Sequence, residues 1–60
     1  MRYEIIAKFN NESVIPMGET NDYDTALDMT NYIIDGASYV KMVEVYDRDN
    51  NESMTLVTRG

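Results

Sequence analysis

The tetrapeptide Asn-Asn-Glu-Ser occurs twice in this chain of 60 residues, at positions 10–13 and 50–53. Each copy separates two segments in which apolar residues recur, as expected of a hairpin with a polar turn. Asn tolerates the positive φ angles of tight hairpin turns, so Asn10 and Asn11 are expected to form a two-residue turn. A second turn is expected over 49–52. Two hairpins leave only the middle of the chain for another element.

The segments around the two turns show the apolar patterns of β-strands. The first should be half-buried, because every second residue belongs to one apolar face: Tyr3, Ile5, Ala7 and Phe9. Pro16, in the returning segment, has no N–H to donate and therefore predicts an edge strand, which Gly18 is expected to help end. Segment 39–47 is rich in Val, Met and Tyr, and both of its faces are apolar, one of them through Val40, Met42 and Tyr46.

Between the hairpins, apolar or small residues recur in steps of three and four, which predicts an amphipathic helix over 22–36. The stripe expected to face the core consists of Tyr23, Ala26, Leu27, Thr30, Ile33, Ile34 and Ala37. Thr20, Asn21 and Asp22 offer capping side chains, and Gly36 is expected just past the helix C-terminus. The opposite stripe is acidic and consists of Asp24, Asp28, Asn31 and Asp35.

These elements predict an α+β fold in the order ββαββ, a single domain over 1–60 with a hairpin at 2–18, the helix at 22–36 and a hairpin at 39–59. An antiparallel sheet of about four strands would carry the helix on one face. The second apolar face of segment 39–47 then needs a cover, from a second copy of the chain or from a target protein. The alternative is that these side chains are partly exposed on a twisted sheet.

The charge of the chain restricts its partners. It carries 11 Asp and Glu against 5 Lys and Arg, a formal net charge of −6, with neither His nor Cys. This charge repels phosphate backbones and anionic lipids, so a basic protein is expected as the partner rather than nucleic acid or a membrane. The alternative is that acidity serves solubility alone. A chain this short without disulfides or zinc ligands also favours a homodimer.

No residue pattern indicates catalysis, a metal or a cofactor. The serines have no His to activate them, and one helix over a small sheet leaves little room for a pocket that tunes paired carboxylates. Asp47, Asp49 and Asn51 fit the start of a calcium loop, but Glu52 and Thr58 stand where that loop needs Gly and Glu. Without an apolar run of membrane-spanning length or a signal-like start, we expect a complete cytoplasmic protein that is not an enzyme.

The acidic stripe is a candidate binding feature. Helix residues four apart are separated by about 6 Å along the axis, so Asp24, Asp28 and Asp35 would present negative charges at fixed spacing, with Glu19 and Asp22 near the helix start. A cleft that holds a phosphate backbone could accept such carboxylates, since Lys and Arg pair with both groups. The alternative is an ordinary solvated helix face.

Two segments carry a resemblance to a known family. Glu12-Ser13-Val14-Ile15 leads from a strand into apolar residues, and Tyr46-Asp47 precedes a polar turn and then Met54-Thr55-Leu56-Val57-Thr58. This combination resembles the phage-encoded uracil-DNA glycosylase inhibitors, small acidic proteins that mimic DNA and occupy the DNA-binding cleft of the enzyme. The order of hairpin, helix and strand is also similar to the smaller, dimeric inhibitors of that class.

The resemblance implies that Glu12 and Ser13, continued by Val14 and Ile15, contact the enzyme, and that the acidic stripe takes the place of phosphates. It further implies an apolar pocket that captures a protruding leucine loop of the enzyme and is lined by Val40, Met42 and Tyr46, with Tyr32 and Met29 from the helix.

The expected function is therefore inhibition of a host DNA-acting enzyme by a phage protein in the host cytoplasm, by occupancy and without turnover. The rival expectation is a structural or accessory module that self-associates through its apolar sheet face.

Overall fold

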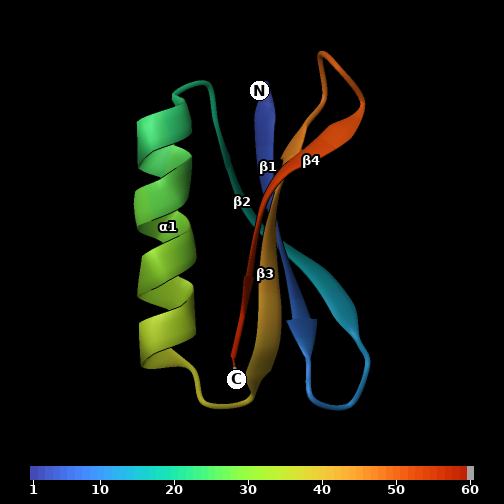
Figure 1. Cartoon of the computed structure of the whole chain (residues 1–60), viewed down its shortest axis with the longest axis vertical. Coiled ribbons are helices and arrows are strands. Elements are labelled where there is room, and N and C mark those ends of the chain that lie inside the picture. Colours follow the sequence, from blue (N-terminus) through green and yellow to red (C-terminus); the bar gives the residue numbers. More distant parts are fainter. Residues whose placement is uncertain (60) are drawn as a thin grey trace.

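The computed structural model describes residues 1–59 and has four antiparallel strands and one helix in the order ββαββ, which confirms the predicted α+β fold. The helix lies along one face of the sheet and leaves the other face open (Figure 1). The elements are β1 Tyr3–Phe9, β2 Val14–Thr20, α1 Tyr23–Gly36, β3 Val40–Asp47 and β4 Glu52–Thr58.

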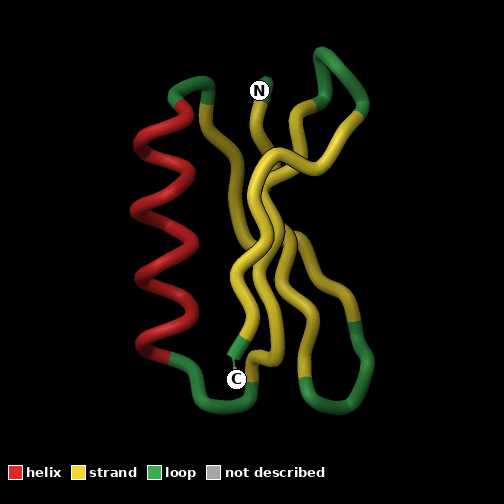
Figure 2. Tube along the Cα trace, in the orientation of Figure 1, coloured by secondary structure: helices red, strands yellow, loops and turns green. Residues whose placement is uncertain are grey.

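The sheet has the strand order β2-β1-β3-β4, and every neighbouring pair is antiparallel. Each hairpin keeps its own strands side by side, while β1 and β3 join the hairpins at the centre. The two hairpin loops consequently lie at opposite ends of the sheet (Figure 2). Pro16 lies in β2 at one edge, as its missing N–H predicts.

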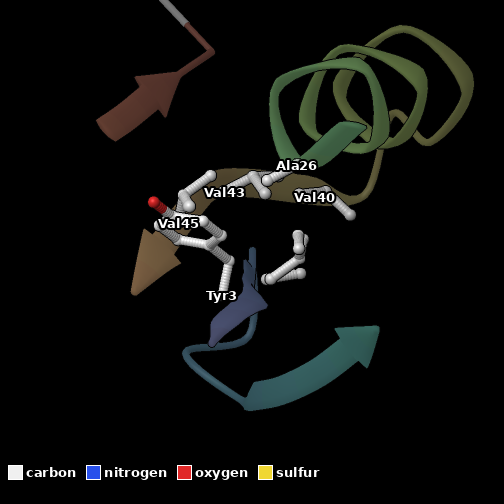
Figure 3. Packing of buried hydrophobic residues seen from close by; sticks show 7 residues of the cluster. Tyr3, Ala26, Val40, Val43 and Val45 are labelled. Atoms are coloured by element: carbon white, nitrogen blue, oxygen red, sulfur yellow. The ribbon is translucent and has the colours of Figure 1, made fainter. Parts of the chain in front are cut away.

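The core lies between α1 and the central strands. Its buried apolar side chains alternate along those strands: Tyr3, Ile5 and Ala7 in β1, and Val40, Val43 and Val45 in β3. Ala26 of α1 completes the cluster (Figure 3). Thr30 is also buried, and its hydroxyl donates to the Ala26 carbonyl at 2.9 Å. The helix positions nearest the sheet are thus small, which lets α1 lie close to it.

A β-bulge in β3 decides which residues face the helix. Phe9 pairs with Val40 and Lys8 with Met42, so Lys41 is an extra residue in β3. The extra residue interrupts the alternation of faces. Val40 is therefore fully buried under the helix, whereas Met42 lies on the open face. The prediction that Val40 shares an exposed face with Met42 is wrong for this reason.

A second bulge lies in β2, where Met17 is the extra residue between Pro16 and Gly18. The strand continues to Thr20, so the expectation that Gly18 helps to end it is wrong. Gly18 instead makes room for the helix, since a Cβ at this position would lie 2.5 Å from the terminal methyl group of Met29.

The first end of α1 is capped as predicted. Asp22 is the N-cap, and its carboxylate accepts hydrogen bonds from the Asp24 N–H at 3.3 Å and from the Thr25 hydroxyl at 2.8 Å. The other end differs from the prediction, because Gly36 is the last helical residue and Ala37 is the C-cap, with φ −129°. The glycine is therefore not used as a left-handed cap.

Arg59 closes the C-terminal end of α1 from outside the helix. Its guanidinium donates to the carbonyls of Ile34 and Ala37, the latter at 2.8 Å, and to the carbonyl of Val40 at 3.1 Å. The last carbonyls of a helix lack intrahelical donors and carry partial negative charge, so a cation is favourable there. The chain beyond β4 thus fastens the helix to the sheet.

The two copies of Asn-Asn-Glu-Ser form different turns. In the first, residues 10–13 separate β1 from β2, two more than the expected two-residue turn, and the left-handed residue is Glu12, with φ 73°. The Glu12 N–H donates to the Phe9 carbonyl at 2.9 Å, and the Phe9 N–H donates to the Ser13 carbonyl at 2.8 Å. In the second, the left-handed residue is Asn51, with φ 53°, and Glu52 already begins β4.

Asp47, at the end of β3, is a buried carboxylate with all its partners supplied by the chain. Arg2 donates to both of its oxygens, at 3.0 and 3.1 Å, and the Asp49 N–H and the Asn50 amide donate at 3.0 and 2.9 Å. The hydrogen bond from Arg2 lowers the pKa of Asp47 most, while burial opposes it. The residues of the partial calcium pattern thus build the second turn.

Candidate protein-binding surface

The acidic stripe of α1 is exposed at every position: Asp24, Asp28, Asn31 and Asp35. At about 100° of rotation per residue, these side chains emerge within a sector about 60° wide, and the outer two lie about 16 Å apart along the axis. No cation of residues 1–59 lies within 4.0 Å of these three aspartates to form an ion pair. The stripe is therefore an uncompensated line of negative charge.

The cationic side chains are engaged elsewhere in the molecule. Their partners are Asp47 and Asp49 for Arg2, Glu12 for Lys8 and Lys41, Glu4 and Glu19 for Arg48, and backbone carbonyls for Arg59. Glu19, expected to extend the stripe, belongs to this network. Hydrogen bonds from Arg48 and from the terminal ammonium group lower the pKa of Glu19. The ion pairs that compensate negative charge are thus concentrated on the strands and loops.

An apolar groove, here called the α1–β2 groove, opens beside the acidic stripe. It consists of two adjoining hollows of about 490 and 480 Å³, which share Met17, Tyr32 and Ile33. The first hollow is completed by Asp35, Gly36, Ala37 and Tyr39, and the second by Asp28 and Met29. Two carboxylates of the acidic stripe therefore also stand in the wall of this groove.

Local structure explains why apolar side chains remain exposed here. Met17 is the extra residue of the β2 bulge and is 44% exposed, while Tyr32, on the flank of α1, is 83% exposed. Tyr39 is 61% exposed, although its ring packs perpendicular to the ring of Phe9 at a centroid distance of 5.5 Å. The Asn10 N–H donates to the Tyr39 carbonyl at 2.9 Å. Such a gathering of exposed apolar groups is typical of a binding surface.

The first of the two segments that carry the family resemblance, 12–15, lies apart from the acidic stripe, in the first loop and in edge strand β2. The Glu12 carboxylate binds Lys8 at 2.9 Å and Lys41 at 3.1 Å, and these hydrogen bonds lower its pKa. Ser13 is exposed, and its N–H donates to the Asn11 side chain at 3.0 Å. The apolar continuation of the segment is exposed too, at Val14 and Ile15.

The pocket expected from the resemblance does not form with its predicted lining. Met42 and Tyr46 lie on the open face of the sheet, whereas Met29 and Tyr32 lie in the α1–β2 groove on the helix side. Val40 is buried between the two layers. The sheet therefore separates the two halves of the expected lining.

Sequence reasoning missed part of the groove, namely Met17, Ile33, Ala37 and Tyr39 as binding residues. Ile33 and Ala37 were expected to face the core, and the helical pattern does not distinguish the core from a groove at its border. Met17 had one available signal, because Pro16 and Gly18 on either side of it in an edge strand indicate a bulge. Tyr39 carries no such signal.

Comparisons with protein-family models, with curated proteins and with solved structures find no significant match to this chain. The helix of the described part of the chain, α1, is 14 residues long, and no helix there has the length and hydropathy needed to cross a bilayer.

Proposed function

We propose that this protein binds a DNA-acting enzyme and inhibits it by occupying the DNA-binding cleft, with uracil-DNA glycosylase as the target. One observation carries the proposal: Asp28 and Asp35 belong both to the uncompensated acidic stripe and to the wall of the apolar α1–β2 groove. Lys and Arg side chains that hold phosphates pair equally with carboxylates. An exposed side chain of the enzyme would enter the groove at the same time.

These two kinds of contact have different consequences. The stripe attracts a basic cleft over a distance and orients the protein, an effect that added salt screens. The groove removes apolar surface from water, which salt does not screen. Inhibition should therefore weaken with salt less steeply than binding of DNA to the same cleft.

The family resemblance adds a contact through Glu12 and Ser13. In the free protein the Glu12 carboxylate already has two lysine partners, so a cation of the enzyme would share it with Lys8 and Lys41 or exchange with one of them. The acidic stripe requires no such exchange. We therefore assign most of the electrostatic contact to α1 and a smaller share to the first hairpin loop.

The rival proposal is a homodimer through the open sheet face, which carries Ile6, Met42, Tyr46 and Leu56. Glu44 lies among these residues, paired in the sheet with Ile6 and Leu56, and no cation of residues 1–59 compensates it. A two-fold dimer would bury two copies of this carboxylate, which is unfavourable without a partner. The charge on the open face thus favours the enzyme-binding proposal over this one.

Two charge-reversal variants test the proposal with the same change in net charge. Asp24→Lys with Asp28→Lys reverses the stripe, whereas Glu44→Lys with Glu52→Lys reverses two uncompensated carboxylates of the sheet. Excision of uracil from a DNA oligonucleotide by uracil-DNA glycosylase is measured with increasing amounts of each protein. The wild type and the sheet variant should inhibit at equimolar ratio, and the stripe variant should need more than about tenfold excess.

Two results would overturn the proposal. One is a wild-type protein that neither inhibits the enzyme nor forms a complex with it by size-exclusion chromatography. The other is an equal loss in both variants, which would mean that total charge matters and the acidic stripe does not.

A further inference from the structure

We infer that the Asp35 end of the α1–β2 groove binds an arginine side chain presented by the protein partner. The inference rests on the proposed function only in expecting a basic partner, and it names the chemical group that the groove receives. An arginine combines an apolar stem with a planar cationic head. The groove offers matching surfaces for both parts.

The apolar surfaces would hold the stem. Met17, Ile33 and Ala37 line the hollow at this end, and its volume of about 490 Å³ lies within the range of about 300–1,000 Å³ usual for ligand sites. The hollow is open to solvent along the helix, so a side chain can enter from a partner surface without movement of the backbone.

The polar and aromatic groups would hold the head. Asp35, Tyr32 and Tyr39 line the same hollow, and no cation of residues 1–59 pairs with the Asp35 carboxylate. A guanidinium binds a carboxylate through two parallel hydrogen bonds and is attracted to the faces of aromatic rings.

A purely apolar group fits this end less well. It would remove water from Asp35, and in the adjoining hollow from Asp28, without replacing the lost hydrogen bonds. The guanidinium of Arg59 binds the carbonyls of Ile34 and Ala37 at this helix end but makes no ion pair with Asp35, so the carboxylate is left for a cation of the partner. Arginine is favoured over lysine, since its head is less strongly hydrated and stacks on aromatic rings.

The probes are three capped tripeptides, Gly-Arg-Gly, Gly-Lys-Gly and Gly-norleucine-Gly, titrated into the full chain at low ionic strength. Binding is followed by NMR through the ring resonances of Tyr32 and Tyr39. We expect the arginine peptide to shift both rings with a Kd of about millimolar, as for a fragment of a larger interface. The lysine peptide should bind more weakly, and the norleucine peptide more weakly still.

Two matched variants locate the binding site of the peptide. Asp35→Asn should weaken binding of the arginine peptide by about three- to fivefold, the effect of an exposed ion pair. Asp24→Asn makes the same change on the same stripe but outside the groove, and should leave the Kd unchanged. Unshifted tyrosine rings, equal binding of the norleucine peptide or an unaffected Asp35→Asn variant would each overturn the inference.

The two proposals can fail separately. A peptide that binds as described, together with a wild-type protein that inhibits no DNA-acting enzyme, would support the groove assignment and remove the proposed function. Inhibition that is lost in the stripe variant but unchanged by Asp35→Asn would support the proposed function and remove the groove assignment.

Discussion

Glu12 combines a demanding backbone conformation with two ion pairs. Its φ of 73° lies in the left-handed region, which costs about 1–2 kcal/mol for most residues with a side chain. Its carboxylate contacts Lys8 and Lys41, which connect the first loop to both central strands. In the second hairpin the left-handed position falls on Asn51, a residue type that tolerates it. Four residues separate the strands in both hairpins, so the place of the tetrapeptide within the loop, rather than its letters, decides which residue is left-handed.

Glu12→Gly and Glu12→Ala both remove the carboxylate and its ion pairs, so they differ only in the backbone. We expect the Gly variant to melt about 4–8 °C above the Ala variant, which corresponds to about 1 kcal/mol in a domain of this size. Circular dichroism during heating measures the difference. At Glu52, which lies in β4 without positive φ, the order should reverse, since Gly weakens a strand. Equal melting of both Glu12 variants would contradict the turn geometry.

At the scale of elements, sequence periodicity is sufficient to locate the strands and the helix. The alternation in β1 and the steps of three and four in α1 reflect burial on one side, and the structure confirms both. A bulge adds one residue without leaving a mark in the pattern. Over residues 39–46 regular alternation puts one charged residue on each otherwise apolar face, Lys41 on one and Glu44 on the other, so the pattern does not single out a bulge at Lys41 or the buried position of Val40.

The same limit applies to the candidate site. The exposed carboxylates of α1 follow from helical spacing alone, and Met29 and Tyr32 were expected to line a pocket. Their true neighbour across the groove is Met17, which is placed there by the bulge in β2. Where that bulge lies relative to the helix is a tertiary feature. The sequence could therefore indicate half of the groove and not the surface that completes it.

The helix end closed by Arg59 gives a prediction for α1 as an element. Arg59→Ala removes the donors to three carbonyls, and we expect the melting temperature to fall by about 4–8 °C, for about 1 kcal/mol of hydrogen bonding. The amides of the last turn should exchange with deuterium faster, while those of β1 keep their relative protection. Arg59→Lys keeps the charge but reaches fewer carbonyls, so its melting temperature should lie between those of the wild type and Arg59→Ala. Unchanged exchange in the last turn would show that the fastening is not needed.

Across the whole molecule, charge is distributed by layer. The cations pair with carboxylates of the strands and loops, or bind carbonyls, while the aspartates on the outer surface of α1 stay uncompensated. Three of the uncompensated negative charges of this chain, whose net charge is −6, thus lie together on the outer surface of α1, at Asp24, Asp28 and Asp35. Long-range attraction of a basic protein would turn that side toward it before contact.

Paired carboxylates also predict how the fold responds to acid. Hydrogen bonds from Arg2, Lys8 and Arg48 lower the pKa values of Asp47, Glu12 and Glu19, respectively. A pKa lowered by folding stabilises the native state above the unfolded value of about 4, and this contribution is lost as the pH falls through the lowered native value.

Urea unfolding followed from pH 7 to pH 2 should therefore show constant stability down to about pH 5 and a decline below about pH 4. Asp47→Asn should lower stability at pH 7 and flatten the decline. Asp28→Asn, which removes a carboxylate without an ion-pair partner in residues 1–59, should leave the shape of the curve unchanged. A wild-type curve that stays flat to pH 2 would contradict this assignment.

The strand order β2-β1-β3-β4 sets the sequence of folding events. Each hairpin and the helix can form from residues that are close in sequence. The central pairing of β1 with β3 instead closes a long loop that contains all of β2 and α1. We expect this late closure to limit the folding rate. Until it occurs, each hairpin exposes the unpaired backbone edge of its most apolar strand. At high protein concentration, these edges would favour strand pairing between different chains.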